Sequence, residues 1–110
     1  MRIFKIMFSV NSETGQGIQG ILISNETETG INFNGYDRGF KFKSSIGKYG
    51  ELPINIEVYN HDPNVASLLN TISPFKITNI RGKITPTVID IAGYVRGMTI
   101  RIKGKFIEEI

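Results

Sequence analysis

Two segments with the alternation of β-strands constrain the fold of this chain more than any other feature. In residues 54–60 the apolar Ile54, Ile56 and Val58 point to one side, and polar residues point to the other. A period of two is typical of a strand that is buried on one face. Residues 88–94 are almost continuously apolar and end in Ala-Gly-Tyr, where the glycine permits a bend or the close approach of another backbone. Neither segment carries a recognisable reactive group, so we expect both to be structural.

The length and composition limit the classes of protein to which the chain can belong. Its 110 residues predict a single domain, residues 1–110. The absence of cysteine excludes disulfides and thiolate metal sites, and gives no sign of an oxidising compartment. Residues 1–10 lack the features of a signal peptide, and no segment has the roughly 20 apolar residues that span a membrane. We therefore expect a soluble intracellular protein without a membrane anchor. The net charge of +3 permits contact with nucleic acid but does not require it.

Similar alternation predicts further strands, separated by turns that contain glycine. Besides the two segments above, with the second extended to residues 85–94, the expected strands are residues 4–10, 18–24, 31–33, 40–43, 75–80 and 99–107. Residues 25–30 are expected to form a loop or a long hairpin tip, and residues 44–53 an exposed loop. Asn34-Gly35 is a strong hairpin signal, and turns are also predicted at residues 81–83 and at Arg96-Gly97.

One short helix is expected at about residues 63–72. Asp62 can cap it, Pro63 suits its first turn and Ser73-Pro74 ends it. The predicted fold is therefore mainly β, a small antiparallel barrel or sandwich with one helix packed against it. The predicted core consists of Phe4, Ile6, Phe8, Ile21, Ile54, Ile56, Val58, Leu68, Leu69, Ile89, Ile91, Ile100 and Ile102.

Few residues have the chemistry of a catalytic or cofactor site. His61, the only histidine, stands in a turn without cysteine and makes a poor metal ligand, although a spatial Ser/His/Asp arrangement stays open. Asp90 is either a general base whose pKa is raised by burial, or more simply a strand residue on the polar face. The glycines at 15, 17 and 20 match a dinucleotide fingerprint, but a strand follows them where the fingerprint needs a helix. We expect no catalytic residue, no metal and no cofactor.

A row of cations follows the last predicted strand. It consists of Arg96, Arg101, Lys103 and Lys105. Such a row is either a solvated face or a surface for nucleic-acid phosphates or another anionic partner. Phe106 and Tyr94 are near the row in sequence, but Phe106 falls on the apolar face of the strand, so the aromatic platform that stacks single-stranded bases is incomplete. We therefore expect weak binding to single-stranded DNA at most.

The order of the strands resembles a known family. Ile-x-Ile-x-Val-Tyr-Asn at residues 54–60, Val-Ile-Asp-Ile-Ala-Gly-Tyr at residues 88–94 and Ile-x-Gly-x-Phe at residues 102–106 are similar to the first β-barrel domain of bacteriophage tail hub and baseplate hub proteins. The resemblance implies a tail-tube-like barrel without catalysis or cofactor. It also implies a homo-oligomeric ring around the tail axis that contacts other tail proteins, with DNA only in transit through a channel. The location would be the virion tail, after synthesis in the bacterial cytoplasm.

Apolar residues on nominally polar faces indicate where such a ring is assembled. Ile3 and Met7 lie on the polar side of the first strand, and residues 21–23 are apolar on both sides. The expected subunit interface consists of Ile3, Met7, Ser44, Gly47, Lys48, Tyr49 and Glu51. The first hypothesis is thus a hub or tube-to-baseplate adaptor. The alternative is a small barrel that binds single-stranded nucleic acid, and an uncharacterised small enzyme comes third.

Overall fold

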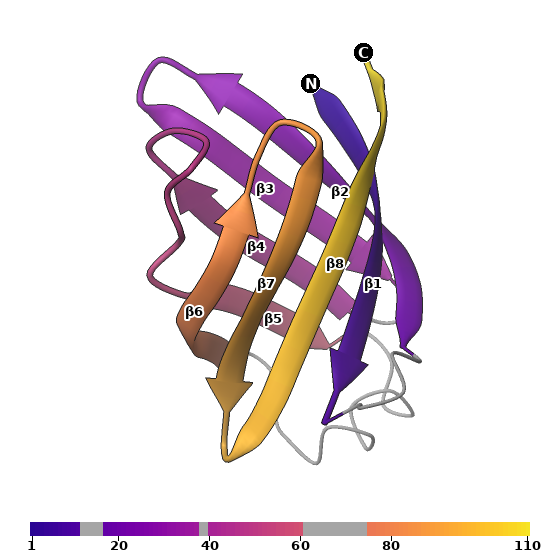
Figure 1. Ribbon diagram of the computed structural model, residues 1–110, viewed down its shortest axis with the longest axis vertical. Helices are drawn as coiled ribbons and strands as arrows, with labels where there is room; N and C mark the ends of the chain where they lie inside the picture. Colours follow the sequence, from indigo (N-terminus) through magenta and orange to yellow (C-terminus); the bar gives the residue numbers. More distant parts are fainter. Residues whose placement is uncertain (12–16, 38–39, 61–74) are drawn as a thin grey trace.

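The computed structural model describes residues 1–11, 17–37, 40–60 and 75–110, which form a closed antiparallel β-barrel (Figure 1). Its eight strands are β1 (Arg2–Val10), β2 (Ile18–Thr27), β3 (Gly30–Asp37), β4 (Phe40–Ile46), β5 (Ile56–Asn60), β6 (Phe75–Ile84), β7 (Val88–Val95) and β8 (Met98–Glu109). Each strand pairs with the next along the chain, and β8 pairs with β1 to close the barrel. The described ranges contain no helix. The predicted β-barrel is therefore confirmed, while the predicted helix at 63–72, with Leu68 and Leu69, lies outside the described residues.

The inside of the barrel is filled by aliphatic and aromatic side chains. Phe8 lies at the centre of an aromatic group, with its ring centroid 5.5 Å from that of Phe40 and 5.1 Å from that of Phe42. An interior void between Phe33, Phe42 and Ile91 has a volume of about 20 Å³, roughly the space of one water molecule. The described part of the barrel is thus a packed core, without the room for a ligand that larger or emptier barrels provide.

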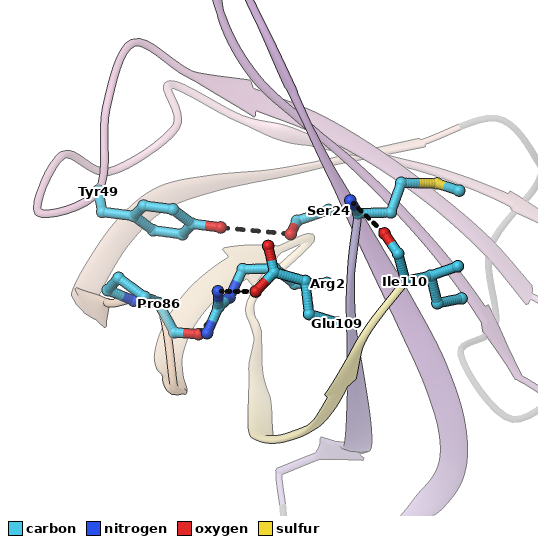
Figure 2. A network of polar contacts seen from close by, with 7 residues as sticks. Arg2, Ser24, Tyr49, Pro86, Glu109 and Ile110 are labelled. Atoms are coloured by element: carbon cyan, nitrogen blue, oxygen red, sulfur yellow. Dashed lines mark hydrogen bonds and ion pairs between the residues drawn. The ribbon is translucent and has the colours of Figure 1, made fainter.

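The chain ends lie together at one end of the barrel, which we call the termini end (Figure 1). Because the strands alternate in direction, the β2–β3, β4–β5 and β6–β7 connections lie at this end as well. Arg2 joins three of these parts, because its Nε donates to the Pro86 carbonyl at 2.8 Å and its Nη1 donates to Glu109 at 3.4 Å (Figure 2). Its guanidinium also lies 4.2 Å from the Phe106 ring centroid.

The β4–β5 connection folds across the mouth of the barrel at this end. The Tyr49 hydroxyl lies 3.2 Å from that of Ser24, whose side chain is fully buried (Figure 2). A buried hydroxyl needs such a partner, because an unsatisfied one costs about 1–3 kcal/mol. The predicted exposed loop at 44–53 is therefore correct only in part: residues 44–46 belong to β4, Tyr49 is half-buried and Pro53 is buried.

Two predicted turns are wrong. Asn34-Gly35 lies inside β3, and the hairpin turn is formed by Glu28 and Thr29. Gly35 is needed for packing rather than for turning, because a Cβ there would lie 3.1 Å from the Phe42 ring and 3.2 Å from Leu22. Residues 81–83 lie inside β6, where the register with β7 shifts between Thr78 and Arg81. An irregularity of this kind in a strand often contains glycine with a positive φ, which is also typical of a turn. The turn at Arg96-Gly97 is confirmed.

Two residues of the predicted core are exposed. The side chain of Ile21 is 47 % exposed, because Leu22 takes the inward position on β2. Ile54 is 91 % exposed, because β5 begins only at Ile56. Ile54 therefore belongs to the loop before the strand and does not take part in the strand's alternation. The other described members of the predicted core are confirmed as buried: Phe4, Ile6, Phe8, Ile56, Val58, Ile89, Ile91, Ile100 and Ile102.

Candidate functional site on the outside of the barrel

Exposed cations gather on the outer surface of four neighbouring strands, β6, β7, β8 and β1. We call this surface the basic face, and its cations are Lys5, Arg81, Lys83, Arg101, Lys103 and Lys105. Asp90 lies at the centre of the face, as the register partner of both Lys83 and Lys103, and its Oδ1 lies 3.6 Å from Arg101 Nη2. This position confirms the simpler interpretation of Asp90 as a strand residue on the polar face. Glu108 and Glu109 add two exposed carboxylates at the end of β8. The face thus holds an excess of positive charge.

The strand register places like charges directly against each other on this face. Lys5 of β1 is the register partner of Lys105 of β8, and Met7 is the partner of Lys103. Like charges directly opposite across an antiparallel pair destabilise a sheet. The sequence therefore keeps an arrangement here that costs stability, as functional sites commonly do.

A groove runs between these lysines. Its volume is about 400 Å³, and its floor is formed by apolar side chains such as Met7 and Val88 together with the backbone of Gly104. Lys5, Lys103 and Lys105 stand around it. The groove therefore combines an apolar floor with a cationic rim, which suits a ligand that has both a flat apolar part and negative charge.

Tyr94 adds an aromatic ring to the same face. Arg81 Nη1 donates to the Tyr94 hydroxyl at 3.3 Å, and the Arg81 guanidinium lies 5.2 Å from the centroid of the tyrosine ring. The hydrogen bond from Arg81 and its positive charge lower the pKa of Tyr94. The ring stays 36 % exposed. The basic face therefore offers an aromatic surface that is held in place by one of its own cations.

The structure changes the membership of the basic row that the sequence predicts. Arg101, Lys103 and Lys105 do share one face, but Arg96 lies in the β7–β8 turn at the end of the barrel. Lys5, Arg81 and Lys83 were missed, because the pairing of distant strands is not visible in a local pattern. Tyr94, which is near the row in sequence, lies on the same outer side of β7 as Asp90. Phe106 is half-buried and packs edge-on against Phe4, with 6.0 Å between the ring centroids.

A second outer surface, on β1, β2 and β3, is apolar. Ile3 is the register partner of Ile23, and Ile21 is the partner of Tyr36. Ile21 and Tyr36 are 47 % and 44 % exposed, while Ile3 and Ile23 are half-buried. We call these four residues the apolar stripe. Met7, the other predicted interface residue of β1, is half-buried and lies between the stripe and the basic face.

The β4–β5 connection carries the remaining predicted interface residues and an exposed apolar side chain. Gly47, Lys48 and Glu51 are exposed, whereas Ser44 lines the inside of the barrel and Tyr49 covers its mouth. Ile54 projects from this connection beside a polar cleft of about 540 Å³. The cleft is lined by Asn32, Phe33, Asn34, Lys43, Ser44, Ser45, Ile54, Asn55 and Glu57.

Asp37 is the one described carboxyl group with an unusual environment. Burial raises its pKa to about 6, although its Oδ1 accepts a hydrogen bond from the Phe40 amide at 3.2 Å. Among the described residues no three His, Asp or Glu side chains come together in a way that could hold a metal. Within the same ranges no helix is long and apolar enough to cross a bilayer. His61 lies outside the described residues.

The chain shows no match to a protein-family model, to a curated protein or to a solved structure.

Proposed function

We propose that the chain is a non-enzymatic structural subunit of a bacteriophage tail or baseplate, where it assembles in a ring around the tail axis. The observation that carries the proposal is the apolar stripe of Ile3, Ile21, Ile23 and Tyr36 on the outside of a barrel whose inside is already packed. Exposure of such a stripe to water costs a free energy of roughly 25 cal/mol per Å² of apolar surface. A neighbouring subunit that covers it removes this cost.

The filled interior supports a role in assembly. The described part of the barrel has room for about one water molecule, so neither a substrate nor a passing chain fits inside it. In the proposed ring the channel lies between subunits, on the ring axis, and the barrels form its wall. The subunit needs no cofactor, and its partners are further copies of itself and other tail proteins in the virion.

Ile54 supplies a candidate counterpart for the stripe. It lies on the β4–β5 connection, whereas the stripe lies on β1, β2 and β3. Two different patches on one subunit suit a heterologous contact, in which a patch of one copy meets another patch of the next. When the rotation between copies closes, contacts of this type form a ring. We therefore place Ile54 of one subunit against the stripe of its neighbour.

Electron microscopy of the parent virus tests this proposal. A reconstruction should show the chain as a ring on the tail axis, with residues 47–55 of one copy against β1–β3 of the next. Absence of the chain from purified particles would contradict the proposal. So would a position away from the tail axis.

Substitutions in the two patches test the contact itself. Ile21→Asp and Ile54→Asp should each reduce incorporation of the chain into particles about tenfold or more, because each replaces an apolar side chain by a carboxylate that the contact would have to desolvate. Ile107→Asp is the matched control, since Ile107 is 53 % exposed but belongs to neither patch. Circular dichroism should show that all three variants keep the barrel. Equal incorporation of all three variants would place the contact elsewhere.

A further inference from the structure

We infer that the basic face binds single-stranded nucleic acid without sequence preference, along the line of β8. The basic face and the apolar stripe meet on β1, where Lys5 is the register partner of Ile21. The inference is nevertheless separate from the proposed ring, because it rests mainly on residues of β6, β7 and β8. It rests on three observations: the opposed lysines, the spacing of the cations on β8, and the groove with Tyr94 near its line.

The opposed lysines distinguish this face from an ordinary solvated surface. On a solvated surface, cations are usually interspersed with carboxylates. Here Asp90 is the carboxylate among the cations at the centre of the face, Glu108 and Glu109 lie at the end of β8, and Lys5 stands directly opposite Lys105. A polyanion would remove their repulsion and would gain entropy from the release of its own counterions.

The spacing of the cations fits an extended chain of phosphates. Arg101, Lys103 and Lys105 occupy alternate positions of one strand and point outward. Alternate residues of a strand lie about 6.7 Å apart, which is of the order of the distance between successive phosphates in an extended nucleic-acid strand. Lys5 flanks this line on β1, which pairs with β8, and Lys83 lies one strand further away on β6, opposite Asp90 of β7. The face therefore presents a straight track of positive charge.

The groove and Tyr94 favour a single strand over a duplex. Bases of a duplex are stacked inside it, whereas those of a single strand can turn toward the protein and stack on aromatic rings. The Tyr94 ring is partly exposed and is held by Arg81, and the apolar floor at Met7 and Val88 offers a second surface for a base. An acidic peptide would use the cations but not the ring. The expectation of weak binding treated the aromatic platform as incomplete because Phe106 faces inward; the structure adds that Tyr94 is partly exposed and is held on the basic face by Arg81.

Fluorescence anisotropy with labelled oligodeoxythymidine of about 15 nucleotides tests the inference, since this length spans one barrel of this size. If four phosphates are neutralised, the slope of log K against log salt should be about −3. Lys103→Ala with Lys105→Ala should make the slope less steep by about 1.4, since each lost phosphate contact contributes about 0.7. Tyr94→Leu should weaken binding about tenfold while it leaves the slope unchanged, because it removes stacking and no charge.

The matched control is Lys43→Ala with Lys48→Ala, which removes the same net charge from β4 and the β4–β5 connection. It should bind like the original protein. If both double variants lose affinity equally, the effect is one of net charge and the inference fails. The inference also fails if polyglutamate displaces the labelled oligonucleotide as well as unlabelled oligonucleotide does, because the face would then suit an acidic protein. It fails as well if duplex DNA of the same length binds more tightly than the single strand. Thermal unfolding should show that every variant is folded.

Discussion

Asp37 is a single residue whose environment makes the stability of the barrel depend on pH. Burial raises its pKa in the folded protein to about 6, from an ordinary value of 3.8. Between these two values the folded protein binds more protons at this site than the unfolded chain does. The contribution of Asp37 therefore lowers the free energy of unfolding as the pH rises from about 4 to about 6, and is constant above that range.

Replacement of Asp37 by asparagine should remove this dependence. The amide oxygen of the new side chain can still accept the hydrogen bond from the Phe40 amide, so this contact is kept. We expect Asp37→Asn to be more stable than the original protein at pH 7 and to have a flatter profile between pH 4 and pH 6. Urea unfolding at a series of pH values measures this, with Glu28→Gln in the exposed β2–β3 turn as the control. Parallel profiles for the original protein and Asp37→Asn would show that the carboxyl group titrates normally.

At the scale of the element, β6 depends on a glycine that its neighbour leaves no room to replace. Gly82 has a φ of +121°, and a Cβ there would lie 2.1 Å from the Asp90 carbonyl oxygen of β7. Gly97 in the β7–β8 turn also has a positive φ, +79°, but a Cβ there would meet no atom within 4 Å. A comparison of substitutions at the two positions therefore separates two contributions to stability: the cost of the backbone conformation and the cost of crowding.

Alanine substitutions at these two glycines should differ clearly. We expect Gly97→Ala to cost about 1 kcal/mol for the left-handed conformation alone, and Gly82→Ala about 3 kcal/mol, because the strand must also move away from Asp90. Chemical unfolding of both variants at one pH gives the two free energies. Equal losses would mean that the bulge in β6 adapts to a side chain at no cost.

Local patterns predicted these strands well and their pairing poorly. Alternation at Ile56 and Val58 identified β5 and its buried side, because the polar residues between them show which side of the strand faces the solvent. In residues 21–23 all side chains are apolar, so parity is fixed only by the pairing of β2 with β1 and β3. Gly35 and Gly82 look like turn residues but are required by close approach inside a sheet. The sequence predicted the cations of the basic face that lie on β8. It did not predict Lys5 and Arg81, because the pairing of strands that are distant in the sequence brings them to this face.

At the scale of the whole molecule, Arg2 holds the point where the barrel closes. It binds the Pro86 carbonyl beside β7 and Glu109 of β8 from its place on β1. Arg2→Met removes the guanidinium, and with it both hydrogen bonds and the contact with the Phe106 ring, and should lower the free energy of unfolding by about 1–3 kcal/mol, the value of hydrogen bonds from a charged donor. Glu109→Gln should change it by less than about 1 kcal/mol, because the ion pair is largely exposed. Calorimetry of the two variants compares them, and a larger loss for Glu109→Gln would show that the ion pair dominates.

The pairing of the first strand with the last also governs how the barrel can form during synthesis. When β1 to β7 have left the ribosome, β1 has only β2 beside it, and its other edge stays open until β8 follows. An open edge beside unburied Phe4 and Phe8 can pair with another nascent chain. The final contact joins residues separated by nearly the whole chain, which slows folding. The interval between synthesis of β7 and closure by β8 is therefore the period in which the open edge of β1 and the unburied core are most exposed to pairing with another chain.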